Sequence, residues 1–515
     1  MAYIGINKGQ ADDGTATPMA VTGDGHLEVD LHGPRLPFGS IHTEGLSVEF
    51  QADPIYGINS DVVYSESGTG GSTTAANNLF TCASGTSAGG NATIQSVSRL
   101  RYRPGQGSIC KFTTVFSTPQ ANSVMVAGLG TAESGFYVGY NGTALGVLHN
   151  TGGVRHIESL QVTTASSTDE NITITLDGTA FSVAVTNSGN IQKTVQEIAD
   201  ATYTGWSAQA VDDTIIFLAG SVGNKTGTMS LSGASTAAGT FTEVTAGAAG
   251  TDTWVTQANW NGDKLDGTGT SGVTLDPTKG NVWAIGMQYL GFGPVEIYCE
   301  VNPSGNNPTF VNVHTFDFPN SLTTPHITQP SFPFTMSAYN TTNTTSISVS
   351  TGSFAGFIEG EKKLKGPRHT VIAETNNFVG STASTYYPLF TIANRRVFNS
   401  RANQSVINII STSVAHDDAT PISFYLIKNA TLLGNPDFSE YHSGSALLVD
   451  KAATTCTTTD RNILFAMETG QNTGLIHDFL DNIQVQPGET VTLAARAVTG
   501  TATYVNGSVN IREDQ

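Results

Sequence analysis

One stretch, residues 281–301, constrains the fold more than any other part of the chain. It holds two runs in which apolar residues occupy every second position, separated by the turn sequence Gly291-Phe-Gly-Pro294. Alternation at period two places these side chains on one face of a β-strand, and glycine and proline favour a chain reversal between the runs. The alternating residues are Trp283, Ile285, Met287 and Tyr289 in the first run and Val295, Ile297, Cys299 and Val301 in the second. Because these eight residues make one face of the two strands almost wholly apolar, we predict a hairpin within a sheet that packs against another sheet.

The composition indicates that strands dominate the rest of the chain as well. Charged residues make up 13% of the sequence, and glycine alone supplies 56 positions. Long runs of Lys, Glu and Ala, which are typical of helical proteins, are missing. Many short strands joined by Gly, Asn and Ser turns explain this composition best.

We therefore expect an all-β protein of two antiparallel β-sandwich (jelly-roll-like) domains, with a small inserted α+β module and an N-terminal arm. The arm contains one alternating strand at 25–32, which needs a partner because a lone strand is only marginally stable in water. The insert contains the one convincing helix, 191–201, with Asn190 as its N-cap. The expected boundaries are 1–37 for a docking arm, 38–157 plus 254–363 for the first sandwich, 158–253 for the insert and 364–515 for the C-terminal sandwich.

The charge balance limits the possible partners. There are 42 acidic and 23 basic side chains, a net charge of −19, and such a surface repels phosphate backbones and anionic lipid. We therefore expect neither nucleic-acid nor membrane binding. The four cysteines lie far apart without metal-ligand spacing, which argues against a disulfide framework. No apolar run is long enough to span a bilayer, and the first residues do not resemble a secretory signal.

No motif indicates catalysis. A Gly-x-Ser-x-Gly elbow in a strand–turn–helix setting does not occur, and the glycine-rich stretch 267–272 lacks the lysine of a phosphate-binding loop. Paired carboxylates for glycoside cleavage are defined by their separation in space, so the sequence neither supports nor excludes them. We expect a protein that is not an enzyme and that needs no cofactor.

Two groups of residues are weak candidates for metal ligands. Asp263, Asp266 and Asp276 lie in a long Gly-rich loop, where carboxylates can surround Ca²⁺, but Asp and Gly also simply form turns, and the spacing fits no known calcium loop. His26, Glu28, Asp30 and His32 share one face of the arm strand and can ligate a transition metal. We favour turn formation for the first group and a solvated strand face for the second.

Two further groups are candidates for ligand binding. Arg99, Arg101 and Arg103 alternate along an expected strand and either hold an acidic partner or pair with acidic side chains of the same protein or a neighbouring subunit, which we favour. Trp254 and Trp260 can stack against sugar rings, as can Trp283, Tyr289 and Tyr298, although Trp283 fits the core better.

Several short motifs, distributed over the whole chain, resemble a family of structural proteins from tailed phages of marine bacteria and cyanobacteria. They are Gly25-His-Leu-Glu-Val, Gly33-Pro-Arg-Leu-Pro-Phe-Gly-Ser-Ile-His-Thr-Glu44, Arg99-Leu-Arg-Tyr-Arg-Pro-Gly-Gln-Gly107, Trp260-Asn-Gly-Asp-Lys-Leu-Asp-Gly267 and Leu275-Asp-Pro-Thr-Lys-Gly-Asn281. Near the C-terminus, Gln486-Pro-Gly-Glu489 and Asn510-Ile-Arg-Glu-Asp514 are similar to the closing strands of several phage fibre and spike domains. The insert is similar to a module that recurs in such proteins.

The resemblance implies a virion surface protein, assembled in the host cytoplasm and associated with the tail as a fibre, baseplate or spike protein that contacts host glycan. It also implies a homo-oligomer, a trimer by analogy with phage fibres, that docks to other virion proteins through its arm. Two alternatives remain, a capsid decoration or head-fibre protein and a glycan-degrading tail spike. The parallel β-helix repeats expected of many such spikes are not visible.

Overall fold

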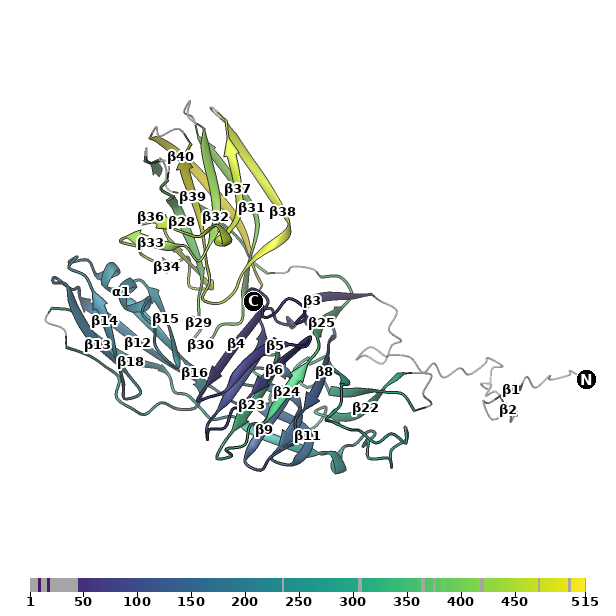
Figure 1. The fold of residues 1–515 in the computed structure, drawn as a ribbon. Coiled ribbons are helices and arrows are strands. Elements are labelled where there is room, and N and C mark those ends of the chain that lie inside the picture. Colours follow the sequence, from purple (N-terminus) through teal and green to yellow (C-terminus); the bar gives the residue numbers. More distant parts are fainter. Residues whose placement is uncertain are drawn as a thin grey trace, which may run out of the picture.

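The computed structural model describes a chain built almost entirely of antiparallel strands (Figure 1). The described residues are 8–10, 16–18, 45–233, 236–303, 308–362, 366–373, 377–380, 382, 384–416, 421–470, 473–498 and 502–514. The expected all-β class is confirmed. The expected arm strand at 25–32, with His26, Glu28, Asp30 and His32, lies outside the described residues. Near the N-terminus, β1 (Lys8–Gln10) pairs with β2 (Ala16–Pro18).

Two large sheets form the first sandwich. The order in the seven-stranded sheet is β19 (Thr251–Thr256), β11 (Ala144–Thr151), β10 (Gly135–Asn141), β9 (Ser123–Gly130), β23 (Phe334–Asn340), β7 (Asn91–Ser96) and β4 (Val63–Gly68). The order in the nine-stranded sheet is β22 (Thr309–Phe316), β21 (Val295–Val301), β20 (Asn281–Met287), β8 (Ser108–Phe116), β24 (Ser348–Thr351), β6 (Leu79–Ala83) and β5 (Ser72–Ala76), while β25 (Phe354–Glu359) joins β8 to β3 (Leu46–Ala52).

Aromatic side chains from both sheets meet in the core of this sandwich. The ring centroids of Phe112 on β8 and Phe334 on β23 lie 5.4 Å apart, as do those of Phe136 on β10 and Phe316 on β22. The inward positions alternate along the strands with half-buried ones, for example along β8. Burial of one face of each sheet is the main stabilising term for such an architecture.

The predicted hairpin at 281–301 is confirmed as β20 and β21. Trp283 pairs with Cys299 and Ile285 with Ile297, and all four side chains are buried. The first strand ends at Met287, earlier than expected. Tyr289 has a positive φ of 50° and belongs to the turn, yet its ring still packs into the core.

The inserted segment has its own hydrophobic cluster, formed by two small sheets and a helix. One sheet has the order β15 (Trp206–Val211), β16 (Thr214–Val222), β12 (Arg155–Thr164) and β18 (Ala238–Thr245), and the other has the order β14 (Thr179–Val185), β13 (Glu170–Leu176) and β17 (Ser230–Ser232). The predicted helix is α1 (Ile191–Ala199), the one α-helix among the described residues, and the Asn190 side chain accepts the Lys193 N–H at its start.

The C-terminal part forms a second pair of sheets around a separate cluster. One sheet has the order β26 (Arg368–Ile372), β40 (Thr503–Asp514), β31 (Val406–His416) and β38 (Gly474–Val485), with β27 (Asn377–Val379) also paired to β40. The other has the order β34 (Ser439–Glu440), β35 (Leu447–Asp450), β28 (Tyr387–Asn394), β39 (Thr490–Ala497), β32 (Ile422–Lys428) and β37 (Ile463–Thr469). Smaller elements are the pairs β29 (Val397–Phe398) with β30 (Arg401–Ala402) and β33 (Thr431–Gly434) with β36 (Ala453–Thr457), and the 3₁₀ turns η1 (Gln257–Asn259) and η2 (Asp460–Asn462).

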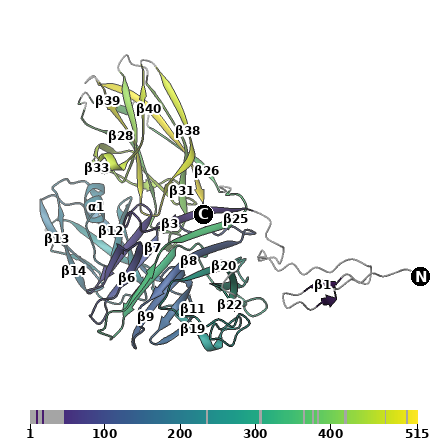
Figure 2. The same ribbon diagram turned by 45° about the vertical axis from the view of Figure 1, so that its right-hand side comes forward.

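These three clusters correspond to three lobes, with the C-terminal pair of sheets and the insert both adjoining the first sandwich (Figures 1 and 2). β19 pairs with β11, so the chain has already returned to the first sandwich at Thr251. Whether the lobes fold as separate domains with the expected boundaries stays a prediction.

One expected strand is wrong. Residues 99–103 form no strand, and Leu100 makes only an isolated bridge to Phe332. The apolar side chains of this segment still face the core, since Leu100 is buried and Tyr102 packs against the same cluster. All four cysteines, Cys82, Cys110, Cys299 and Cys456, are free and buried. Among the described residues, no helix has the length and apolar character needed to cross a membrane.

Candidate functional site

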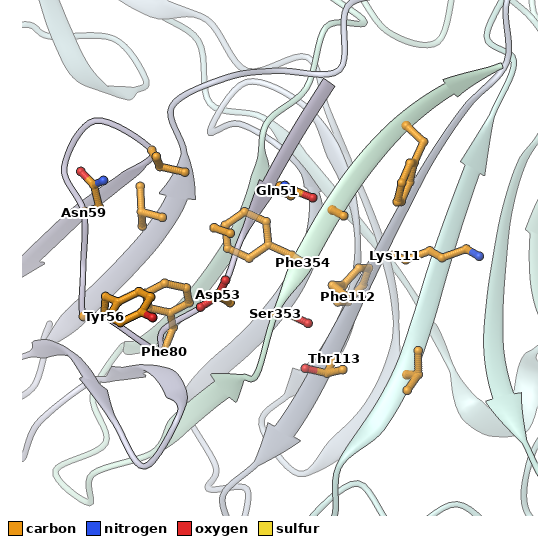
Figure 3. Close-up of a pocket in the computed structure, with 17 residues that line it drawn as sticks. Gln51, Asp53, Tyr56, Asn59, Phe80, Lys111, Phe112, Thr113, Ser353 and Phe354 are labelled. Carbon is orange, nitrogen blue, oxygen red and sulfur yellow. The ribbon is translucent and has the colours of Figure 1, made fainter. Parts of the chain in front are cut away.

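A pocket on the first sandwich lies where β3 ends and the loop 53–62 begins (Figure 3). Its volume is about 550 Å³. The loop contributes Asp53, Tyr56 and Asn59, and Lys111 on β8 lies on the opposite side of the pocket in Figure 3. A concave site with a few polar groups around apolar walls is the usual form of a small-ligand site.

Tyr56 is the most unusual side chain of this pocket. It is 99% exposed, and its neighbour Ile55 is 62% exposed. No described residue covers the Tyr56 ring, so the ring is available for stacking contacts at the edge of the pocket.

Local hydrogen bonds give the loop a defined shape. Asp53 Oδ1 accepts the Ile55 N–H at 3.0 Å, and Asn59 Oδ1 accepts the Asp61 N–H at 3.0 Å. The Gly57 N–H donates to the Pro54 carbonyl at 3.0 Å. Asp and Asn side chains that bond the backbone two residues later are typical turn formers. The turns present the Tyr56 ring and leave Asp53 Oδ2 and the Asn59 amide N–H groups without a hydrogen bond to any described residue.

Buried aromatic rings support the pocket from below. Phe354 contacts Phe80 at 6.2 Å and stacks on Phe334 at 4.2 Å between ring centroids. Lys111 Nζ lies 5.3 Å from the centre of the Phe310 ring, a distance typical of a cation–π contact. Phe80 and Phe354 therefore form an apolar wall of the pocket, and the loop residues supply its polar groups.

The residues that line the pocket include aromatic rings, a carboxylate, amides and hydroxyl groups, while the Lys111 ammonium points away from Tyr56 toward the Phe310 ring (Figure 3). A hydroxyl-rich ligand both donates and accepts hydrogen bonds and has apolar C–H faces, so it matches this mixture. Asp53 is the one carboxylate that lines the pocket among the described residues. Glycoside cleavage normally uses two carboxylates.

The three aspartates considered for calcium do not converge on one point. Asp263 is buried and accepts the Leu265 N–H at 2.9 Å and the Ser271 N–H at 2.6 Å. Asp266 and Asp276 each accept the N–H and hydroxyl of the threonine two residues later. All three carboxylates thus serve their own turns, and none lies in the pocket.

The aromatic candidates for sugar stacking also lie elsewhere. Trp260 and Trp283 are buried, and their indole N–H groups donate to the Val255 carbonyl at 3.2 Å and to Thr114 Oγ1 at 2.9 Å. Trp254 is half-buried on β19 and packs against a small apolar cluster on the seven-stranded sheet. Tyr298 is also half-buried and donates to Glu296 at 2.6 Å.

Two of the three arginines, Arg101 and Arg103, bond to other parts of the same chain, whereas Arg99 Nη1 is buried without a hydrogen-bond partner. Arg103 pairs with Glu49 and with Asp514, each at 3.2 Å, and Arg101 donates to the Gln404 carbonyl. Burial lowers the pKa of Arg99 and of Arg101 to about 10. Asp514 and Gln404 belong to the C-terminal lobe, so these contacts join it to the first sandwich.

One group of potential metal ligands occurs among the described residues, formed by His156, Glu158 and Glu243. His156 Nε2 lies 3.0 Å from Glu158 and 4.0 Å from Glu243, while its Nδ1 accepts the Gly247 N–H at 3.3 Å. An acceptor at Nδ1 places the proton of the neutral ring on Nε2, where a metal would need a lone pair. The geometry therefore favours a hydrogen-bonded histidine–glutamate pair over a metal site.

Sequence reasoning missed the Tyr56 pocket. The signal was the segment Asp53-Pro-Ile-Tyr-Gly57, in which two large apolar residues stand between turn formers. A tight turn offers no core position for both of them, so one or both must face solvent.

Comparison with known proteins places the chain in no family. No family model and no curated protein matches its sequence. Among solved structures, a legume lectin-like domain from Entamoeba histolytica is similar with 8% identity and a TM-score of 0.24, covering 57% of this chain and 89% of that one. An engineered GH43 glycoside hydrolase with endo-xylanase and exo-arabinofuranosidase activity is similar with 10% identity and a TM-score of 0.23, covering 66% of this chain and 48% of that one. Likenesses this weak carry no argument about function.

Proposed function

We propose that this protein is a non-enzymatic structural component of a tailed-phage virion that binds host-surface glycan through the Tyr56 pocket. The observation that carries the glycan part is the fully exposed Tyr56 ring at the edge of a polar pocket. The virion part is supported by the phage-like motifs along the sequence. In this proposal the protein is tail-associated and trimeric, and its N-terminal arm docks to the particle.

Binding to an array of bacterial surface glycans tests the first part. Wild-type protein is expected to bind a subset of glycans, and Tyr56→Ala is expected to weaken that binding at least tenfold because the stacking surface is removed. Tyr504→Ala is the matched control, since Tyr504 is 55% exposed on β40 in a different lobe. Equal binding by wild type and Tyr56→Ala would exclude the pocket as the glycan site.

Gold-labelled antibody on intact particles, viewed by electron microscopy, tests the second part. We expect label at the tail. Label over the head would instead indicate a capsid decoration or head-fibre protein, and particles without label would contradict a virion role. A light-scattering mass of one chain would contradict the trimer.

A further inference from the structure

A second cavity lies between the insert and the C-terminal lobe, away from the Tyr56 pocket. Its volume is about 410 Å³. The insert provides the C-terminal end of α1 and the start of β15, and the C-terminal lobe provides residues that include Arg396, Phe438 and Gly488. We propose that this cavity is a second binding site, for one neutral pyranose residue of a glycan.

The walls of the cavity are fixed to each other by hydrogen bonds. Gln209 Nε2 donates to the Asn394 carbonyl at 3.2 Å, and Gln209 Oε1 accepts the Arg396 N–H at 2.6 Å. The Asp212 N–H donates to the Phe438 carbonyl at 2.7 Å. These hydrogen bonds join the two lobes directly beside the cavity. The cavity walls are therefore held at fixed positions relative to each other.

Arg396 is the first polar group that points to a ligand. Its side chain is half-buried, and burial lowers its pKa. Its guanidinium lines the cavity and makes no hydrogen bond or ion pair with a described residue. The nearby Glu489 is already paired with Lys428 at 2.7 Å. A Cβ at Gly488 would lie 2.5 Å from Arg396 Cζ, so the close backbone holds the guanidinium in place. A guanidinium that faces a cavity and has no partner in the protein can donate its N–H groups to a ligand.

The insert side supplies an acceptor and an aromatic surface. One oxygen of Asp200 accepts the Gln196 amide at 2.7 Å, and its other oxygen has no partner among the described residues. Trp206 lines the cavity as well and is half-buried, and its indole N–H makes no hydrogen bond to a described residue. Hydroxyl groups of Thr202, Ser207 and Thr490 complete the lining.

The charges of the lining select a neutral ligand. Asp200 and the carbonyl end of α1 disfavour an anion, and Arg396 disfavours a cation. A pyranose offers hydroxyl groups that accept from a guanidinium and donate to a carboxylate, and a C–H face that packs on indole. Its size suits a small cavity, and its contacts would span both lobes.

The test uses full-length protein carrying Tyr56→Ala, so that the first pocket cannot contribute. The probes are the methyl pyranosides of glucose, galactose, mannose and N-acetylglucosamine, followed by saturation-transfer NMR and calorimetric titration. We expect at least one probe to bind, and Arg396→Met or Thr202→Arg to weaken its binding at least tenfold. Thr204→Arg is the matched control, because Thr204 is exposed two residues away and does not line the cavity.

Two outcomes would overturn the proposal. One is that no probe binds the Tyr56→Ala protein, which leaves a cavity that holds only water. The other is that binding persists unchanged in Thr202→Arg, a variant at an exposed position that should fold even if Arg396→Met does not. Neither result bears on the proposal for the Tyr56 pocket, because that pocket is tested separately by glycan-array binding of the wild-type protein and Tyr56→Ala.

Discussion

At the scale of single residues, Asp263 shows how a carboxylate can serve the fold instead of a metal. Burial raises its pKa, but hydrogen bonds from the Leu265 and Ser271 N–H groups outweigh that effect and lower the pKa. The loop closes so tightly on this carboxylate that a Cβ at Gly269 would lie 1.9 Å from Oδ1. Backbone N–H groups therefore occupy the positions around the Asp263 carboxylate where a calcium site would hold the cation.

We expect Asp263→Ala to lower the free energy of unfolding by about 2 kcal/mol, because it leaves buried N–H groups without an acceptor. Asp266→Ala and Asp276→Ala are matched controls from the same loop whose carboxylates are exposed, and they should leave the urea midpoint almost unchanged. Calcium should shift none of the midpoints. Stabilisation of the wild type by calcium that is lost in Asp263→Ala would restore the metal hypothesis.

His149 and His326 predict a loss of stability in acid. Their ring centroids lie 5.9 Å apart, stacked on Phe136 at 4.6 Å and on Phe318 at 3.7 Å. Burial lowers the pKa of each to about 4, and three of the four ring nitrogens have no partner. Between the ordinary value of 6.5 and about 4 the unfolded chain binds more protons than the folded one, so the free energy of unfolding falls as the pH falls.

The resulting fall in the free energy of unfolding amounts to at most roughly 3 kcal/mol for each histidine ring. Carboxylates also titrate in this range, so the measurement is a comparison of urea melts across pH for the wild type and for His149→Phe/His326→Phe. The double variant should show a flatter slope between pH 6.5 and 4, whereas His477→Phe, at an exposed position, should keep the wild-type slope. Parallel slopes for wild type and double variant would refute the prediction.

At the scale of elements, strands, turns and the helix could be predicted where neighbouring residues in the sequence determine the local structure. The hairpin at 281–301 and helix α1 with its Asn190 cap follow from periodicity and capping chemistry, which are local. The segment 99–103 alternates just as clearly but forms no strand, because strand formation also needs a neighbour in register along its whole length. The Tyr56 pocket was missed for the same reason, since its walls come from segments far apart in sequence.

The hairpin of β10 and β11 gives a test of turn chemistry. Asn141 pairs with Ala144, so the two-residue loop is Gly142-Thr143, and Gly142 has a positive φ of 59°. A glycine at the first loop position fits the type II′ pattern. Gly142→Ala should lower the free energy of unfolding by about 1–2 kcal/mol, because an added Cβ disfavours this backbone conformation.

Gly280→Ala is the control for that change. Neither position has an atom near enough to clash with a Cβ, and Gly280 lacks the positive φ, so the two variants separate backbone conformation from packing. Chemical denaturation of both proteins measures the difference. Equal midpoints would show that the turn tolerates a side chain and that its conformation does not depend on glycine.

At the scale of the whole molecule, the insert enters and leaves the first sandwich at one point. The Val154 N–H donates to the Ala248 carbonyl and the Ala248 N–H donates back to Val154, both at 2.9 Å. Arg155 then pairs with Glu133 of the first sandwich at 2.5 Å. Chain ends that meet in this way allow a segment to be removed without separating the strands on either side.

We therefore expect that replacing 156–246 with a short Gly/Ser linker leaves the first sandwich and the C-terminal lobe folded. The two main hydrophobic clusters of these lobes contain no residue of the insert, although Val211 packs against a smaller cluster of the C-terminal lobe. The variant keeps Arg155 as the partner of Glu133. The variant loses the Gln209 and Asp212 contacts to the C-terminal lobe, so a modest fall in its melting temperature is consistent with the structure. Calorimetry should still show a cooperative transition, and hydrogen exchange should still protect β11 and its partner β19. If the cooperative transition disappears, the insert is part of the folding unit of the first sandwich, and the expected domain organisation is wrong.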